Sequence, residues 1–208
     1  VLSDSIKAVA SAIPTKAPQV ALNSCCLEFD LGSISFVGFD GYKLIKYSLD
    51  MSDTGVLDFR EKILIPSEAA LAISKSLAKG KSNVEMSFCN NNDKKYLIIE
   101  KDGIIIAVRL RNYNYPDYSK LMRSDYDFTF VIDKSKLKET ISSITGIGNA
   151  KEALPVHFIF TEDKVSLRFV TQDSTVSKTL NIESKDGQVM RFKLLAKTLK
   201  DVFPYLKD

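Results

Sequence analysis

Apolar residues recur along this chain at two spacings, and each change of spacing marks a new element. The first run, from Ile6 to Ile13, follows helical spacing. It predicts an amphipathic helix over 3–13, with Ser3 or Asp4 as its N-cap. Three further helices are expected at 67–77, 135–144 and 195–206.

Between the helices, apolar and polar residues alternate, which predicts β-strands. Two Asp-Gly pairs, Asp40-Gly41 and Asp102-Gly103, stand between such runs and predict hairpin turns. After the first turn, Leu44 and Lys46 should point to the same side of the strand. Strands are expected at 24–29, 33–37, 42–49, 59–65, 83–88, 95–100, 104–110, 128–132, 156–160, 165–170, 174–182 and 189–194.

The order of elements repeats, and apolar positions 131 residues apart coincide. Self-similarity at a fixed period indicates a duplicated unit. We therefore predict a tandem of two similar α+β domains. The matched pairs are Ile6 with Leu137, Ile13 with Ile144, Leu27 with Phe158, Phe29 with Phe160, Ile34 with Val165, and Phe36 with Leu167.

Neither copy is complete, and we place the two domains at 1–124 and 125–208. The first lacks the strand that precedes its helix, the counterpart of 128–132. The second lacks the three strands that correspond to 83–110. Because missing strands leave unpaired sheet edges, we expect the sequence to be a piece of a longer protein, cut at both ends.

Composition places the 208-residue chain among ordinary soluble proteins, with 45% hydrophobic and 26% charged residues. No apolar run has the length of a membrane span, and no signal peptide is recognisable. We therefore expect no membrane partner. A net charge of +3 permits nucleic acid as a partner without requiring it.

The three cysteines, Cys25, Cys26 and Cys89, are too few for a disulfide framework. With a single histidine, His157, they form no usual zinc set. We expect buried free thiols in a reducing compartment, no metal and no cofactor. Cys25 and Cys26 should point to opposite faces of one strand. His157 is expected at the edge of the core or on the surface.

Four short motifs occur in the order of a known family. They are Leu22-Asn23, Phe39-Asp40-Gly41-Tyr42-Lys43-Leu44, Ile65-Pro66, and Arg109-Leu110 followed by Tyr115-Pro116-Asp117-Tyr118. Together with the repeat, they resemble the middle domain and most of the third domain of the bacterial DNA polymerase III β subunit, the sliding clamp. The resemblance implies the DNA-clamp fold, with tandem α+β domains in which two helices pack on antiparallel sheets.

The resemblance is distant within the longest motif. Phe39, Tyr42 and Lys43 stand where the family has threonine, histidine and arginine. A divergent chromosomal clamp, or a clamp from a phage or mobile element, fits this pattern. The resemblance implies a cytoplasmic homodimeric ring that slides on double-stranded DNA without sequence specificity and catalyses no reaction. DNA polymerase and clamp-loader peptides would be its protein partners.

In that family the helices line the hole through which DNA passes, and helix lysines attract phosphates. The alternative is that these lysines only confer solubility. A loop that touches DNA in the family corresponds to 15–20, although Val20-Ala21 replaces its aromatic pair. The DNA-binding candidates are Lys7, Lys16, Gln19, Lys75, Lys79, Lys136, Lys138, Lys197 and Lys200.

The family also docks a short extended peptide between its middle and third domains. Lys43 and Lys120 stand where it has arginine, so bidentate hydrogen bonding would be lost. The alternative is an apolar sheet edge without a ligand. The positions carried over are Leu22, Phe39, Gly41, Tyr42, Lys43, Leu44, Pro116, Lys120 and Leu121.

Two other functions compete with this interpretation. An enzyme would need a catalytic set, yet the carboxylates of the turns lack a histidine partner, a phosphate loop and metal-ligand spacing. These carboxylates are Asp30, Asp40, Asp117, Asp125 and Asp127. The other alternative is a clamp-like interaction scaffold that does not form a ring.

Overall fold

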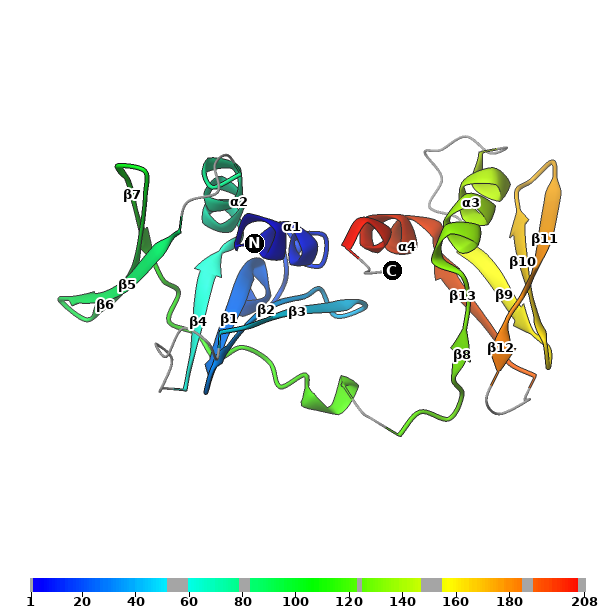
Figure 1. The fold of residues 1–208 in the computed structure, drawn as a ribbon, viewed down its shortest axis with the longest axis horizontal. Coiled ribbons are helices and arrows are strands. Elements are labelled where there is room, and N and C mark those ends of the chain that lie inside the picture. The colour runs from blue at the N-terminus through cyan, green and yellow to red at the C-terminus, as the bar shows by residue number, and fades with distance from the viewer. Residues whose placement is uncertain are drawn as a thin grey trace. The chain divides into compact units, whose positions relative to one another are not determined.

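The computed structural model describes residues 2–51, 60–78, 83–122, 125–146, 155–184 and 189–205. The chain divides into two compact units, Val1–Tyr118 and Ser119–Asp208. Within the described residues, each unit is α+β, with antiparallel sheets and two α-helices (Figure 1). The predicted fold class is therefore confirmed. The division falls a few residues before the domain boundary expected at 124.

The first unit is built around a four-stranded antiparallel sheet of order β3-β2-β1-β4. Its strands are β1 (Ser24–Asp30), β2 (Ser33–Phe39), β3 (Leu44–Asp50) and β4 (Glu61–Pro66). β3 begins two residues later than expected, because Tyr42 belongs to the turn. Phe59, where the fourth strand was expected to start, lies outside the described residues.

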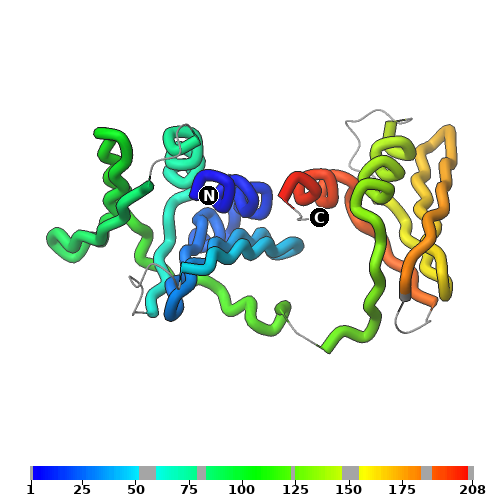
Figure 2. Tube along the Cα trace, in the orientation of Figure 1, coloured from blue at the N-terminus to red at the C-terminus, as the bar shows by residue number. Residues whose placement is uncertain are grey.

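A second sheet of order β5-β6-β7 completes this unit. The trace runs through it as two consecutive hairpins (Figure 2). β5 is Glu85–Asn91, β6 is Lys94–Lys101 and β7 is Ile104–Arg109. Asp102 and Gly103 have φ of 51° and 77°. This left-handed backbone is typical of a tight hairpin, so the second Asp-Gly turn is confirmed.

Helices α1 (Leu2–Ala10) and α2 (Ser67–Ser76) pack on each other and on the first sheet. The expected N-cap was wrong, because α1 already includes Ser3. The buried Ser3 hydroxyl donates to the Ser74 carbonyl of α2 at 2.6 Å. This serine therefore links the two helices.

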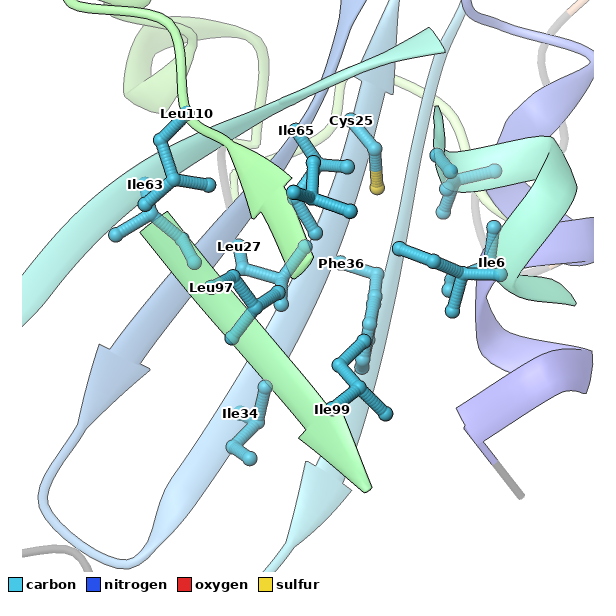
Figure 3. Close-up of a cluster of buried hydrophobic side chains, with 14 of the residues drawn as sticks. Ile6, Cys25, Leu27, Ile34, Phe36, Ile63, Ile65, Leu97, Ile99 and Leu110 are labelled. Carbon is cyan, nitrogen blue, oxygen red and sulfur yellow. The ribbon is translucent and has the colours of Figure 1, made fainter. Parts of the chain in front are cut away.

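The core of the first unit lies between the two sheets and the helices. Leu27 and Phe36 face it from the first sheet, Leu97 and Ile99 from β6, and Ile6 from α1 (Figure 3). All five side chains are at most 1% exposed. Burial of such side chains stabilises a fold by about 1.5–3 kcal/mol each, so this cluster fixes how the sheets face each other.

The second unit repeats this arrangement in its main sheet, whose order is β11-β10-β9-β13. The strands are β9 (Pro155–Phe160), β10 (Lys164–Val170), β11 (Thr175–Asn181) and β13 (Arg191–Leu195). Cα pairing is also repeated. Leu27 faces Phe36 in the first unit, and Phe158 faces Leu167 in the second. The 131-residue repeat in the sequence is therefore a repeat of structure.

The remaining elements of the second unit are shorter than expected in two places. β8 is only Phe130–Val131 and pairs with β12 (Glu183–Ser184), while α3 spans Lys134–Thr145. α4 (Ala196–Val202) gives way to a 3-10 turn, Phe203–Tyr205. Pro204 explains this end, because proline cannot donate a helical hydrogen bond. Leu206, the expected end, lies outside the described residues.

The cysteines follow the prediction in two cases of three. Cys25 and Cys26 are buried and belong to different clusters on the two faces of β1, as expected. Burial raises the pKa of both thiols, that of Cys26 to about 12, so both stay protonated. Cys89 is exposed on β5, which corrects the expectation of burial. No helix in the described part of the chain could cross a membrane.

Candidate functional site

The face of the first sheet that points away from α1 and α2, the outward face, carries an apolar floor. The floor consists of Cys26, Val37 and Leu64, which are register neighbours on β1, β2 and β4. Tyr118, only 6% exposed, packs on the floor, and Leu44 lies against it. The chain after β7 therefore returns across this face as an extended segment.

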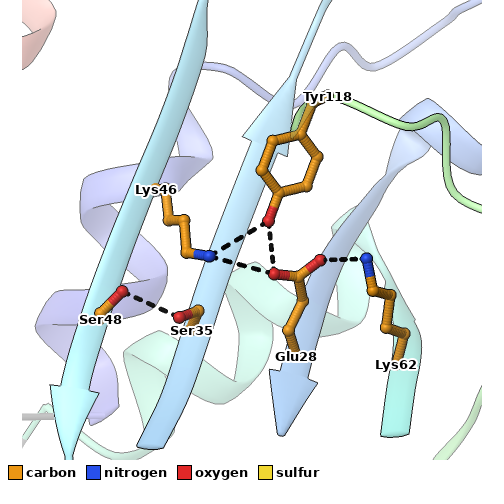
Figure 4. Close-up of polar contacts among 6 residues, drawn as sticks. All are labelled: Glu28, Ser35, Lys46, Ser48, Lys62 and Tyr118. Carbon is orange, nitrogen blue, oxygen red and sulfur yellow. Dashed lines mark hydrogen bonds and ion pairs between the residues drawn. The ribbon is translucent and has the colours of Figure 1, made fainter. Parts of the chain in front are cut away.

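The hydroxyl end of the Tyr118 side chain belongs to a polar cluster on the same outward face (Figure 4). Its hydroxyl donates a short hydrogen bond to the Glu28 carboxylate. Lys46 Nζ lies 3.2 Å and Lys62 Nζ 2.7 Å from the two oxygens of that carboxylate. Both ammonium groups lie 5.7 Å from the centroid of the Tyr118 ring, in cation–π range. Glu28 thus anchors the segment that ends at Tyr118.

The Glu28 carboxylate is held in its charged form. Burial by itself would raise its pKa, but hydrogen bonds from Lys62, Tyr118 and Lys46 outweigh burial, and the pKa lies below its usual range. Burial, followed by the hydrogen bond to Glu28, raises the pKa of Tyr118. The cluster is therefore a carboxylate, a neutral phenol and two ammonium groups at neutral pH.

Glu28→Gln should lower the free energy of unfolding by about 1–3 kcal/mol at pH 7, as expected for hydrogen bonds to a charged group. The folded-state pKa lies below the unfolded value, so this contribution is present above about pH 4.5. It is lost as pH falls through the folded-state pKa. Urea unfolding of wild type and variant from pH 3 to 8 measures the difference.

The control for this experiment is Glu61→Gln. Glu61 pairs with Lys95 at 2.7 Å, but its side chain is 38% exposed. Exposed ion pairs contribute about 0–1 kcal/mol, so the control should differ little from wild type. A constant Glu28→Gln effect across the pH range would contradict the assigned cluster.

The Asp40-Gly41 turn projects a side chain from the edge of the sheet. Asp40 Oδ1 accepts the backbone N–H groups of Tyr42 and Lys43 at 2.9 and 2.8 Å. Gly41 has φ of 92°, which favours glycine. Tyr42 is fully exposed, at 101%. The turn is thus pinned by its own aspartate, and its tyrosine is free to contact a partner.

The other candidates for peptide docking have different environments. Phe39 and Lys43 are half-buried beside this turn, and Pro116 is half-buried in the returning segment. Leu22 is buried, at 8%, in the 3-10 turn Val20–Asn23. Lys120 and Leu121 are exposed on the 3-10 turn Ser119–Leu121 of the second unit. The structure brings Leu44 onto the apolar floor together with the returning segment.

Most candidate lysines lie on the helices as predicted, and most are exposed. The exposed ones are Lys75 on α2, Lys136 and Lys138 on α3, and Lys197 and Lys200 on α4. Lys7 on α1 is half-buried, and Lys16 and Gln19 are exposed on the loop before β1. Lys200 Nζ also donates to Thr145 Oγ1 at 2.8 Å. Lys79 lies outside the described residues.

Sequence reasoning missed the Glu28 cluster as a part of this site. Its signal was a single carboxylate at the centre of β1, flanked by Leu27 and Phe29. A carboxylate at this position faces away from the core, and a partly buried carboxylate needs hydrogen-bonding or oppositely charged partners. The partners, Lys46, Lys62 and Tyr118, come from three distant segments, so only the fold reveals them.

Comparisons with known proteins agree with this fold. No family model matches the chain. The beta sliding clamps of Helicobacter pylori strains ATCC 700392 / 26695 and J99 / ATCC 700824 are 24% and 23% identical over 180 residues. In each case this is 86% of this chain and 44% of the curated protein. The chain is therefore similar in sequence to sliding clamps, as a divergent relative would be. It spans less than half the length of these relatives.

Crystal structures of clamps share the fold at low sequence identity. A putative DNA polymerase III beta subunit from Eubacterium rectale ATCC 33656 covers 100% of this chain with a TM-score of 0.88 and 18% identity. The clamp of Bacillus subtilis covers 100% with a TM-score of 0.85 and 15% identity. This chain matches 55% and 53% of those two chains. Clamp architecture is therefore retained although most residues differ.

Proposed function

We propose that this chain is part of a sliding clamp that encircles duplex DNA without sequence specificity and tethers a replicative polymerase. Its similarity to a beta sliding clamp carries the proposal, because the matched region takes in 86% of the chain. The test is topological: the assembled protein should stay on closed circular duplex DNA and leave it after linearisation.

The charges of the helices support the DNA part of this proposal. α3 and α4 together carry five lysines and two carboxylates. Lysine is a mobile, strongly hydrated cation, suited to phosphate attraction without base readout. Such contacts hold DNA loosely, which is what sliding requires.

No catalytic step is part of the proposed function. Two of the turn carboxylates already have structural partners, because Asp30 pairs with Arg60 at 2.7 Å and Asp40 caps its own turn. The clamp would act by linking other proteins to DNA. DNA polymerase and clamp-loader peptides are the proposed protein partners.

Peptide docking is proposed to involve the Asp40-Gly41 turn of the first unit, together with the other positions that the family resemblance implies. Tyr42 and Leu121 offer exposed apolar surface, while Phe39 and Leu44 offer half-buried surface. Aromatic side chains are enriched among the residues that contribute most to binding, and apolar pockets give extended peptides their specificity. Because Lys43 and Lys120 replace arginines, they would supply charge without a bidentate fork.

Leu121→Asp should weaken the binding of a Leu/Phe-bearing polymerase peptide by about tenfold or more, because it places a charge against the peptide's apolar anchors. Fluorescence anisotropy of a labelled peptide measures this. The matched control is Leu31→Asp, since Leu31 and Leu121 are 57% and 58% exposed. Equal affinity of wild type and Leu121→Asp would discard the docking assignment.

Ring formation is proposed to require self-association. Chemical crosslinking and light scattering of the full-length protein should show a dimer. A strict monomer that still binds the peptide would contradict the ring and fit the clamp-like scaffold instead.

A further inference from the structure

The sheet of the second unit has an outward face whose chemistry differs from that of the first. Val156, Phe158, Val165 and Leu167 point into the core, so the alternate residues of β9 and β10 point away from it. The register extends this face across all four strands. Its positions are Pro155, His157, Ile159, Lys164, Ser166, Arg168, Val170, Thr175, Ser177, Thr179, Asn181, Arg191, Lys193 and Leu195.

Basic side chains form a row across this face. Arg168 of β10 faces His157 of β9, and His157 faces Lys193 of β13. Arg191 stands in the next row, opposite Ile159. Arg168, Lys193 and Arg191 are exposed and His157 is half-buried. All fourteen positions of the face are described, and they include no carboxylate.

The same positions in the first unit hold the apolar floor. Cys26 faces Val37 and Leu64 there, as His157 faces Arg168 and Lys193 here. The first unit also shows what such a face can hold, because the extended segment ending at Tyr118 lies on the floor. The outward face of the first sheet thus holds an extended chain. The outward face of the second sheet has the same strand arrangement but carries basic side chains where the first has apolar ones.

Arg168 and Lys193 flank His157 on its two sides, and two like charges on one sheet face repel each other. In the first unit Glu28 balances two lysines, whereas Ile159 occupies the corresponding position here. In the described part of the chain, no acidic side chain lies opposite Arg168 or Lys193 in the register. A carboxylate-bearing ligand would remove this repulsion and gain charge-assisted hydrogen bonds.

We propose that the outward face of the β11-β10-β9-β13 sheet docks an extended, acidic segment of a partner protein. The partner's carboxylates would pair with Arg168, Lys193 and Arg191. The hydroxyls of Ser166 and Ser177, in the adjacent register positions, would accept or donate further hydrogen bonds. This surface belongs to the second unit and the Asp40-Gly41 turn to the first, and the proposal does not require the protein to encircle DNA.

The same observations disfavour single-stranded nucleic acid as the occupant. Proteins that bind single strands combine basic grooves with aromatic side chains on which bases stack. The fourteen positions of this face include no aromatic side chain other than the His157 imidazole. The apolar positions, including Ile159, Val170 and Leu195, suit aliphatic side chains of a peptide.

The test uses the full-length protein and a labelled peptide of alternating glutamate and leucine, measured by fluorescence anisotropy at low salt. A glutamine-for-glutamate peptide is the uncharged probe. We expect saturable binding of the acidic peptide only. The double variant Arg168→Gln/Lys193→Gln should weaken it by about tenfold. Both side chains are exposed, and thermal unfolding checks that the variant remains folded.

The matched control is Lys94→Gln/Lys178→Gln, which also removes two exposed positive charges. Lys178 lies on β11 but faces Leu167 in register, so it points to the other side of the sheet. The control should bind like wild type. Three results would overturn the proposal: no binding of the acidic peptide, equal losses in both double variants, or tighter binding of oligo(dT) that Arg168→Gln/Lys193→Gln abolishes.

Discussion

Binding to a short linear DNA duplex should weaken by about 1,000-fold or more at 0.1 M salt when glutamine replaces four exposed lysines of α3 and α4. Each phosphate contact contributes about 0.9 to the slope of log affinity against log salt, or up to about eightfold at this salt concentration. Four such contacts together account for the expected loss of affinity for DNA. The four residues are Lys136, Lys138, Lys197 and Lys200.

Fluorescence anisotropy over a range of salt concentrations measures both the affinity and the slope. The slope should fall by about 3 to 4 in the variant. The control replaces four exposed strand lysines by glutamine, which gives the same change in net charge. An equal loss in the control would show that only net charge matters. The control residues are Lys94, Lys95, Lys164 and Lys178.

Gly38→Ala should destabilise the first unit by about 1–3 kcal/mol or more, as overpacking does. Gly38 lies on β2 where the end of α1 and its following turn cross the strand. A Cβ there would overlap the Val9 carbonyl oxygen and lie 3.1 Å from Ile13 Cγ1. Since the main obstacle is backbone, the helix must shift. Urea unfolding measures the change.

Gly41→Ala is the matched control, because a Cβ at Gly41 meets nothing within 4 Å. The destabilisation caused by Gly41→Ala comes only from the φ of 92° and should be about 1 kcal/mol. The two variants thus separate a steric cost from a backbone cost. A Gly38→Ala change no larger than that of Gly41→Ala would contradict the observed contact between α1 and β2.

Features that depend on neighbouring residues could be predicted from the sequence. The Asp40-Gly41 and Asp102-Gly103 turns follow from local backbone preference, and both occur. The duplication could also be detected in the sequence, because equivalent apolar residues such as Leu27 and Phe158 occur at matching positions of the two copies. These signals were sufficient for the fold class.

Features that depend on distant segments could not be predicted. Ser3 has the chemistry of a helix cap, but its position beside Ser74 gives it another partner. Cys89 has the apolar character of a core residue, yet it falls on the exposed side of β5. The contact of Tyr118 with Glu28 joins residues that are 90 positions apart. In each case tertiary placement overrides residue type.

Sequence patterns also did not determine which side chains of the docking site are exposed. The motif from Phe39 to Leu44 identified a family but not the environment of each side chain. The structure shows Tyr42 fully exposed and Leu44 packed against the apolar floor. Two members of one motif, separated by a single residue, therefore have different expected roles, Tyr42 as a contact for a partner and Leu44 as support.

Retention on DNA of different topology tests the central claim most directly. The full-length protein, loaded on nicked circular duplex DNA and passed through a gel-filtration column in high salt, should elute with the DNA. Cutting the same circle at one site before the column should release the protein. Equal retention on circular and linear DNA, or none on either, would contradict a clamp that encircles the duplex.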